Sequence, residues 1–156
     1  MSDNFIPNFD LLLKGGRVLD PANGIDDNLD VGISGMVIGA VEKDIASSRS
    51  LRTVDVTGLI VSPGLIDLHA HFWGYEWSIK PDELCLASGV TTAVDAGGSG
   101  YLTFDEFNEK VISKSKVRIF ALLNIAALGM TGEPEQDLEG MSVEFSLQKI
   151  LQRPDL

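Results

Sequence analysis

Short apolar runs separated by turn signals fill the first part of the chain. Four such runs, rich in Val, Ile and Leu, lie at residues 10–20, 29–35, 36–44 and 52–61. Runs of this length are typical of strands joined by tight turns. They predict a small β-sandwich domain over residues 1–61. Residues 43–52 lack an apolar period, which predicts an exposed loop that tolerates substitution.

After Pro63 the pattern changes to apolar strands that alternate with helix-length segments. Strands are expected at residues 65–72, 90–96 and 116–127, and helices at 81–88, 104–115 and 142–152. This alternation predicts an α/β fold with a parallel sheet and crossover helices. The pattern over residues 62–156 therefore predicts the first three or so βα units of a TIM (β/α)8 barrel. A complete barrel takes about 250 residues, so this one is expected to be truncated, with apolar surface lacking a partner.

The ends of the expected helices carry recognisable signals. Pro81 suits the first turn of the first helix. Thr103 and Glu106 are spaced as a capping box at the start of the second. Ser142 is an N-cap candidate for the third. The third strand is almost continuously apolar, which is typical of a strand buried on both faces.

Composition narrows the class of protein. Hydrophobic residues make up 44% and charged residues 22% of the chain, and the formal net charge is −11. This is typical of a globular protein and argues against nucleic acid or an anionic membrane as a partner. No segment approaches the roughly 20 apolar residues of a membrane span, and the start lacks the pattern of a signal peptide. The single cysteine, Cys85, lies in an apolar segment, which favours a buried packing role over a reactive thiol. A single cysteine cannot form an intramolecular disulfide, which favours a cytoplasmic location.

The two histidines of the chain, His69 and His71, are two residues apart at the end of an expected strand. Side chains on a strand repeat direction every second residue, so both imidazoles are expected on one side. Such a pair can bind one transition-metal ion, and catalytic groups of β/α barrels lie at this end of the strands. For an isolated pair, surface or hydrogen-bonded core histidines are the alternative.

The surrounding residues carry a resemblance. VSPGLIDLHAHF at residues 61–72, preceded by VDVTG, resembles the opening of the amidohydrolase superfamily. PDELCLASGVTTAVDAGGSG and RIFALLNIAALGM look like its dihydroorotase-like and N-acyl deacetylase branch. The resemblance implies a metal-dependent hydrolase that cleaves an amide-type C–N bond of a small molecule. It also implies a homo-oligomer and zinc as the divalent metal, with two ions in the complete enzyme.

By the same resemblance, His69 and His71 are metal ligands. The remaining ligands and the catalytic aspartate are expected after residue 156, so no catalytic residue is expected within this chain. The alternative is a truncated, catalytically inactive fragment or pseudoenzyme that acts as an interaction module. A metal-binding protein without catalysis has less support, because closed structural sites usually use four ligands.

Five other residues are candidates for a place near the metal or the substrate. Asp67 is expected on the same side as His69, where it orients an imidazole or anchors the barrel floor. Asp95 is either a supporting residue of the site or the start of a turn. Asn124 binds substrate or satisfies loop backbone. Trp73 and Tyr75 belong to an aromatic loop, FWGYEW, which forms a pocket wall or packs against the next loop.

Overall fold

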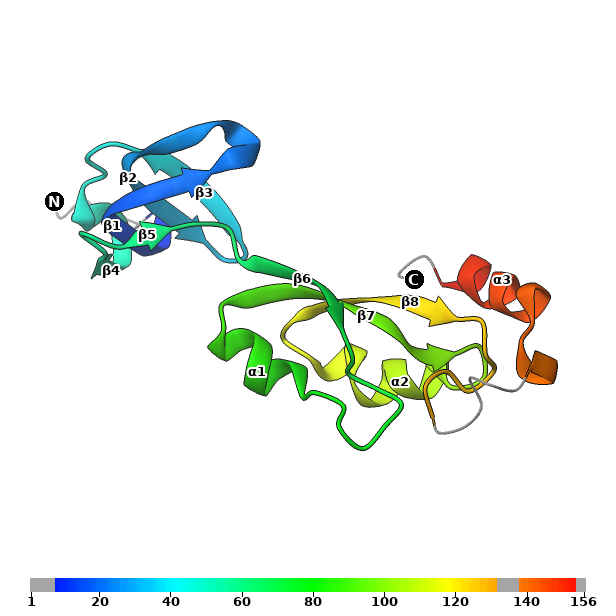
Figure 1. Cartoon of the computed structure of the whole chain (residues 1–156). Coiled ribbons are helices and arrows are strands. Elements are labelled where there is room, and N and C mark those ends of the chain that lie inside the picture. Colours follow the sequence, from blue (N-terminus) through cyan, green and yellow to red (C-terminus); the bar gives the residue numbers. More distant parts are fainter. Residues whose placement is uncertain (1–7, 132–137, 154–156) are drawn as a thin grey trace, which may run out of the picture. The chain divides into compact units, whose positions relative to one another are not determined.

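A computed structural model describes residues 8–131 and 138–153 of the chain. It divides into two compact units that meet at the Pro63–Gly64 bond. The first unit is a β-sheet, and the second combines three parallel strands with helices (Figure 1). The predicted α/β class is therefore confirmed. None of the helices in the described part of the chain has the length and apolar character of a membrane span.

The first unit is one five-stranded sheet. Its strands are β1 (Phe9–Asp20), β2 (Ile25–Ser34), β3 (Val37–Glu42), β4 (Ser50–Asp55) and β5 (Ile60–Val61). The order is β3-β2-β1-β4, with β5 also beside β1. We expected two stacked sheets, but the long strand β1 pairs with β4 near its start and with β5 near its end. A register shift between Leu13 and Gly16 lets this single strand serve both partners.

The expected exposed loop at residues 43–52 is only partly a loop, and this prediction was wrong at Ile45. Ile45 is 2% exposed and packs with Phe9 and Leu12 in the core of the first unit. Its main-chain N–H donates to the Asp30 carboxylate at 2.9 Å, and its carbonyl accepts a bond from Lys14 at 3.0 Å. One apolar residue in a polar segment gives no periodic signal, so its burial depends on tertiary contacts.

The second unit contains a three-stranded parallel sheet in the order β6-β7-β8. The strands are β6 (Leu65–Ala70), β7 (Val90–Gly100) and β8 (Arg118–Asn124), and the helices are α1 (Pro81–Ala87), α2 (Phe104–Lys110) and α3 (Val143–Gln152). α1 connects β6 to β7 and α2 connects β7 to β8, as the sequence predicts. The described residues of the second unit form three parallel strands, and these three strands do not form a closed barrel.

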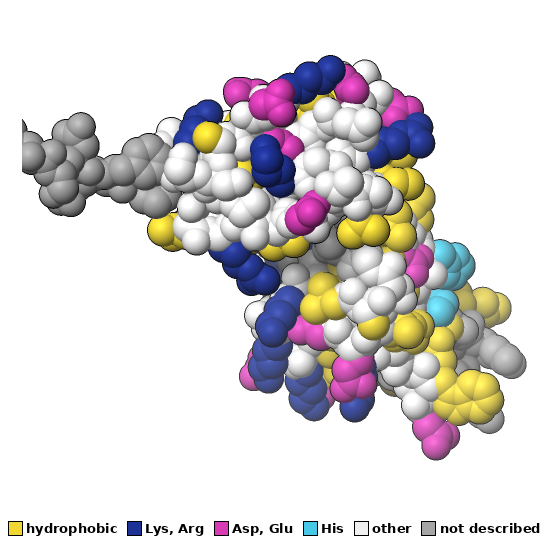
Figure 2. Space-filling model, turned by 90° about the vertical axis from the view of Figure 1, so that its left-hand side faces the viewer, with side chains coloured by type: hydrophobic (Ala, Val, Ile, Leu, Met, Phe, Trp, Pro, Cys, Tyr) yellow, Lys and Arg dark blue, Asp and Glu magenta, His cyan; other side chains and the backbone are white. Residues whose placement is uncertain are grey.

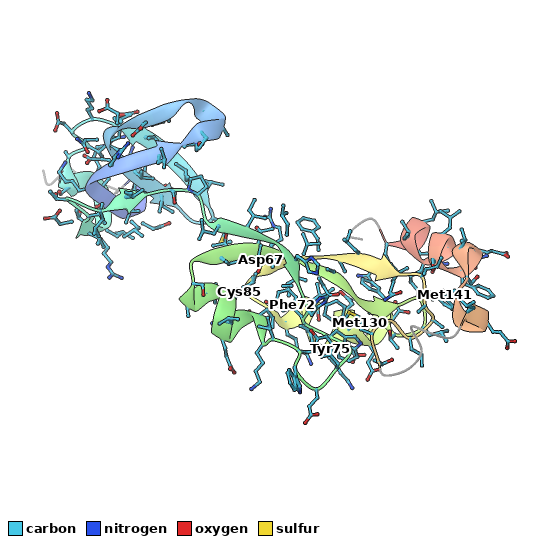
Figure 3. The ribbon with its side chains drawn as sticks, viewed as in Figure 1. Asp67, Phe72, Tyr75, Cys85, Met130 and Met141 are labelled. Carbon is cyan, nitrogen blue, oxygen red and sulfur yellow. The ribbon has the colours of Figure 1, made fainter. Side chains whose placement is uncertain are left out.

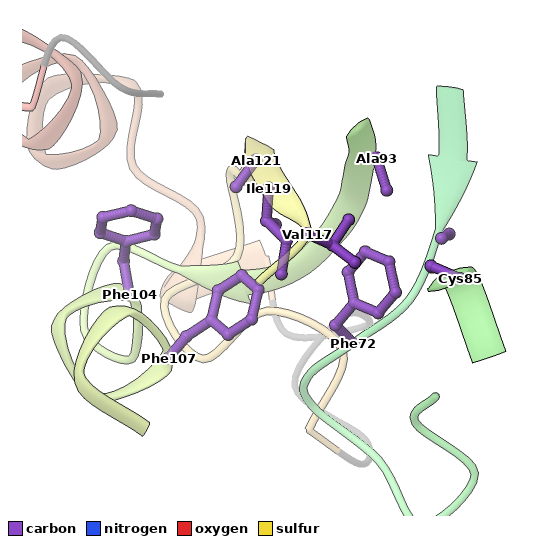
Figure 4. Packing of buried hydrophobic residues seen from close by; sticks show 9 residues of the cluster. Phe72, Cys85, Ala93, Phe104, Phe107, Val117, Ile119 and Ala121 are labelled. Atoms are coloured by element: carbon purple, nitrogen blue, oxygen red, sulfur yellow. The ribbon is translucent and has the colours of Figure 1, made fainter. Parts of the chain in front are cut away.

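The core of this unit lies between the sheet and the helices (Figure 4). Phe104 and Phe107 of α2 are fully buried against strand residues such as Ala93 and Ala121. On β8, Phe120 and Leu122 point away from this core and are 43% and 61% exposed. Burial of β8 on both faces is therefore not observed in the described residues, because the helices cover only one face.

Cys85 belongs to the same core (Figure 4). It is 5% exposed. Burial raises the pKa of its thiol, and the negative charges of Asp67 and Asp82 raise it further. A thiol that is buried and protonated is a packing residue, as the apolar sequence around it predicts.

Two of the three predicted helix starts are observed. Pro81 occupies the first turn of α1, and the Ser142 hydroxyl accepts the Phe145 N–H at the start of α3, over 3.2 Å. The prediction of a capping box at the start of α2 was wrong, because the Thr103 side chain makes no capping hydrogen bond there. The Thr103 hydroxyl instead donates to the Leu128 carbonyl at 3.1 Å, and Glu106 pairs with Lys110.

Candidate metal centre

His69 and His71 lie at the carboxyl end of β6. His69 belongs to the strand, and His71 directly follows its last residue, Ala70. Ala70 is buried in the helix-covered core, so the two imidazoles lie on the other face of the sheet. Their ring centroids are 5.2 Å apart with an interplanar angle of 84°. Figure 2 shows histidine side chains at the molecular surface, next to hydrophobic ones.

The His71 ring is half-buried, and its Nδ1 atom is buried without a hydrogen-bond partner among the described residues. The Tyr75 ring lies beside it in an edge-to-face arrangement, with the two ring centroids 5.8 Å apart. A buried nitrogen without a partner is costly for a protein unless a ligand or an ion satisfies it. Because no described residue bonds this nitrogen, the His71 ring is available to coordinate a metal ion.

Asp67 does not lie on the histidine side of β6, contrary to the alternation expected from the sequence. Asp67 is paired with Ala93, and Ala70 with Asp95, so three steps along β6 match two along β7. This bulge places Asp67 and Ala70 on the same face, because Ala93 and Asp95 are themselves two residues apart. The charge of Asp67 acts on Cys85 of α1, which covers that face. Its carboxylate accepts the main-chain N–H of His69 at 3.0 Å.

Asp95 is a fully buried carboxylate at the carboxyl end of the sheet. One oxygen accepts the Phe72 N–H at 2.8 Å and the other accepts the Gly98 N–H at 2.7 Å. Burial raises the pKa of Asp95, although these N–H groups and nearby His71 oppose the rise. Asp95 therefore binds the chain that follows His71 and also the backbone of Gly98, three residues further along β7. The turn expected after Asp95 is not observed, because residues 95–100 continue the strand.

Asn124 links the ends of β7 and β8. Its side-chain N–H donates to the Gly97 carbonyl at 3.1 Å, and its side-chain oxygen accepts the Ala126 N–H at 3.0 Å. Both polar ends of the amide therefore contact backbone. Of the two roles considered for Asn124, this geometry matches the satisfaction of loop backbone.

The aromatic loop after β6 divides between the core and the surface. Phe72 is buried, and the Trp73 ring stacks on Phe107 of α2 with centroids 5.7 Å apart. Trp73 thus packs inward rather than over the histidines. Tyr75 is 40% exposed beside His71, and Figure 3 places it in the loop that follows Phe72.

Close backbone packing at this edge was not foreseen from the sequence. A Cβ atom on Gly98 would lie 2.4 Å from the Trp73 carbonyl oxygen, and one on Gly74 would lie 2.5 Å from the Gly98 carbonyl oxygen. The Met130 N–H donates to the same Gly98 carbonyl at 3.0 Å. Glycine is required where backbones approach so closely. The GGSG segment at residues 97–100 was the available signal.

The chain is similar to known proteins in both sequence and structure. No family model matches the chain. A deacetylase of Brucella anthropi is 42% identical over 95 residues, which are 60% of this chain and 24% of that protein. A dihydroorotase of Citrifermentans bemidjiense is 35% identical over 126 residues, which are 76% of this chain and 29% of that protein. The matches thus span about a quarter of the length of these relatives.

Solved structures of related enzymes have a fold similar to that of this chain. A dihydroorotase crystal structure matches 93% of this chain and 40% of its own, with a TM-score of 0.82 and 28% identity. An adenine deaminase crystal structure matches 95% and 39%, with a TM-score of 0.80 and 30% identity. The chain belongs to the amidohydrolase superfamily. Within that superfamily it is dihydroorotase-like.

Membership of the amidohydrolase superfamily implies a divalent metal, and the residues at the end of β6 fit one in part. Two imidazoles share a face, and the buried Nδ1 of His71 has no partner in the described part of the chain. Imidazole nitrogen suits transition metals such as zinc. Among the described residues, no group of three or more His, Cys, Asp or Glu side chains surrounds a common point. The histidine pair therefore supplies part of a ligand set.

Proposed function

We propose that this chain carries the first metal ligands of an enzyme that hydrolyses an amide-type C–N bond in a small molecule. The observation that carries the proposal is the position of His69 and His71. They lie on one face, at the carboxyl end of the first strand of a parallel sheet. That edge is where catalytic groups gather in β/α barrels. The relatives named deacetylase and dihydroorotase support amide-type substrates.

In this proposal, each residue has a limited task. His69 and His71 hold the ion through ring nitrogens. A bound divalent metal lowers the pKa of water toward neutrality and polarises a carbonyl group. Tyr75, which is half-exposed beside His71, forms part of the wall that substrate contacts. Trp73 supports that wall from the core through its contact with Phe107.

The finer features of the proposal come from the resemblance. The metal is zinc, with two ions in the complete enzyme, and the enzyme is a homo-oligomer. The cytoplasmic location is proposed on a different ground, the single buried cysteine. The substrate is an N-acyl compound or a cyclic amide. The other ligands and the catalytic aspartate follow residue 156.

The first test is metal binding by the purified chain. Zinc and cobalt(II) titrations are compared for the wild type, His69→Ala, His71→Ala and the double variant. Because the chain has only two histidines, their ring signals in NMR spectra are assigned directly from the single variants. We expect metal to shift both sets of ring signals in the wild type and binding to be lost in the double variant.

A matched control is Glu76→Gln, in the exposed part of the same loop. It tests whether an acidic chain of net charge −11 attracts cations without a specific site. We expect it to bind metal like the wild type. Unchanged binding in the double histidine variant would contradict the proposed site and favour the interaction-module alternative.

The second test is hydrolysis of dihydroorotate and of N-acetyl amino acids by the complete, metal-loaded enzyme that contains this chain. Activity that depends on added metal and disappears in His69→Ala/His71→Ala supports the proposal. Normal hydrolysis by the double variant contradicts it.

A further inference from the structure

The peptide group that joins His71 to Phe72 is held at both of its polar ends. Its carbonyl accepts the Ile79 N–H at 2.9 Å. Its N–H donates to the Asp95 carboxylate at 2.8 Å. A peptide group is planar, so two opposed hydrogen bonds fix the orientation of that plane and restrict the backbone torsions on either side.

Buried side chains on both sides of His71 restrict it further. Ala70 is 5% exposed and Phe72 is 3% exposed, and both belong to the core cluster. His71 is thus the half-buried residue between two anchored neighbours. The direction of its imidazole follows from a backbone that Asp95 and Ile79 hold in place.

Asp95 is suited to this task by its two oxygens. Each accepts one main-chain N–H, from Phe72 and from Gly98, and the side chain is 0% exposed. The Gly98 carbonyl in turn accepts the Met130 N–H. One carboxylate therefore joins the loop that follows β6 to the end of β7, and Gly98 extends this connection to the loop that follows β8.

We propose that Asp95 is a positioning residue, which holds His71 in the orientation that binds metal. The inference rests on the proposed function, since it needs His71 to be a ligand. Asp95 acts through the Phe72 N–H and does not contact the metal or the substrate, because it is buried and both of its oxygens accept backbone N–H groups. Loss of a group that hydrogen-bonds a metal-binding side chain directly typically weakens metal binding by about 10–100-fold. Asp95 instead bonds the peptide group that carries His71, so this range is the scale against which its effect is measured.

The test uses Asp95→Asn in the full chain. An amide has one acceptor oxygen, so one of the two N–H groups would face another N–H donor. We expect the zinc and cobalt(II) dissociation constants to rise by about 10–100-fold. We also expect the ring signals of His71 in NMR spectra to shift in the metal-free protein, more than those of His69.

Asp82→Asn is the matched control. Asp82 also accepts main-chain N–H groups within the second unit, from Lys116 at 2.9 Å and Val117 at 3.4 Å, but it belongs to α1. The control loses stability by the same chemistry without touching the chain around His71. We expect its metal dissociation constants to stay within about twofold of the wild type. Equal weakening in both variants would mean that Asp95 acts only through stability, and would overturn the inference.

Asp95→Glu provides a second variant in case Asp95→Asn is unfolded at the temperature of the titration. It keeps the charge and both oxygens but is longer by one methylene group. We expect its metal affinity to be lower than that of the wild type and higher than that of any folded Asp95→Asn protein. Wild-type affinity in a folded Asp95→Asn or Asp95→Glu protein would overturn the positioning role.

Failure of this inference is distinct from failure of the proposed function. If His71→Ala abolishes metal binding while Asp95→Asn binds like the wild type, only the role of Asp95 is refuted. If His71→Ala itself binds metal like the wild type, the proposed site is refuted, and the inference falls with it.

Discussion

Asp82, in the first turn of α1, accepts a hydrogen bond from the Ser115 hydroxyl at 2.5 Å, although the two residues are 33 positions apart. The same oxygen accepts the Lys116 N–H at 2.9 Å. These bonds join the start of α1 to the segment that leads into β8.

This relationship predicts how acid affects the second unit. The Ser115 hydroxyl lowers the pKa of Asp82 below its ordinary value of 3.8, and the N–H groups of Lys116 and Val117 add to this. The unfolded chain therefore binds the proton more readily than the folded chain. The contribution of Asp82 is present above pH 3.8 and is lost as pH falls through the lowered folded-state pKa.

We expect Asp82→Asn to lower the free energy of unfolding at pH 7 and to reduce its decline between pH 5 and pH 2. Urea unfolding followed by circular dichroism at several pH values measures both effects. Glu83→Gln, one residue further on and 73% exposed in its side chain, is the control and should change little. An acid-induced decline in Asp82→Asn as steep as that of the wild type would contradict the assignment.

The second prediction concerns the core between α2 and the sheet. Phe107 is 0% exposed, and its ring contacts both Trp73 and Phe104. Phe107→Ala removes this ring from a packed environment and should lower the free energy of unfolding by about 3–5 kcal/mol. Thermal and urea unfolding provide the measurement.

Leu102→Ala is the control for this substitution. Leu102 lies close to the start of α2 but is 67% exposed, so the expected loss is below about 0.5 kcal/mol. Similar losses for Phe107→Ala and Leu102→Ala would show that the core is not organised around α2 as described.

The third prediction concerns the buried carboxylate of the first unit. Asp30 is 4% exposed and accepts bonds from Lys14 at 2.8 Å, from Gly15 N–H at 2.8 Å and from Ile45 N–H at 2.9 Å. Burial raises the pKa of Asp30, but these partners outweigh it and leave the pKa lowered. Asp30→Asn leaves a buried donor without an acceptor and should cost about 1–3 kcal/mol.

Asp27→Asn is its control, because Asp27 pairs with Lys43 at an exposed position. Ion pairs of this kind add little to stability. Asp30→Asn should therefore lower the unfolding midpoint, whereas Asp27→Asn leaves it nearly unchanged. The reverse order of effects would contradict the buried network.

Most elements of the second unit could be predicted from local patterns. Apolar runs and helix-length segments alternate strongly enough to locate β6, β7, β8 and the three helices. The shared face of His69 and His71 was predictable too, because it depends on two residues of one strand end. Such features need no knowledge of distant contacts.

Other features depend on partners far along the chain. The spacing of Thr103 and Glu106 predicts that the Thr103 hydroxyl caps α2, yet this hydroxyl donates to the Leu128 carbonyl instead. Ile45 looks exposed in its polar segment, yet the first unit buries it. A local pattern cannot reveal which distant group will compete for a hydroxyl or cover an apolar side chain.

By itself, the sequence determined the order of the elements and the pair of histidines at the end of the first parallel strand. Only the tertiary structure decided which neighbouring side chains serve that pair. The bulge in β6 turns Asp67 toward α1, and the pairing of β6 with β7 brings Asp95 against the Phe72 N–H. The physical reason is that register and hydrogen-bond partners between strands are set by contacts across the sheet, whereas alternation along one strand is set by its own backbone.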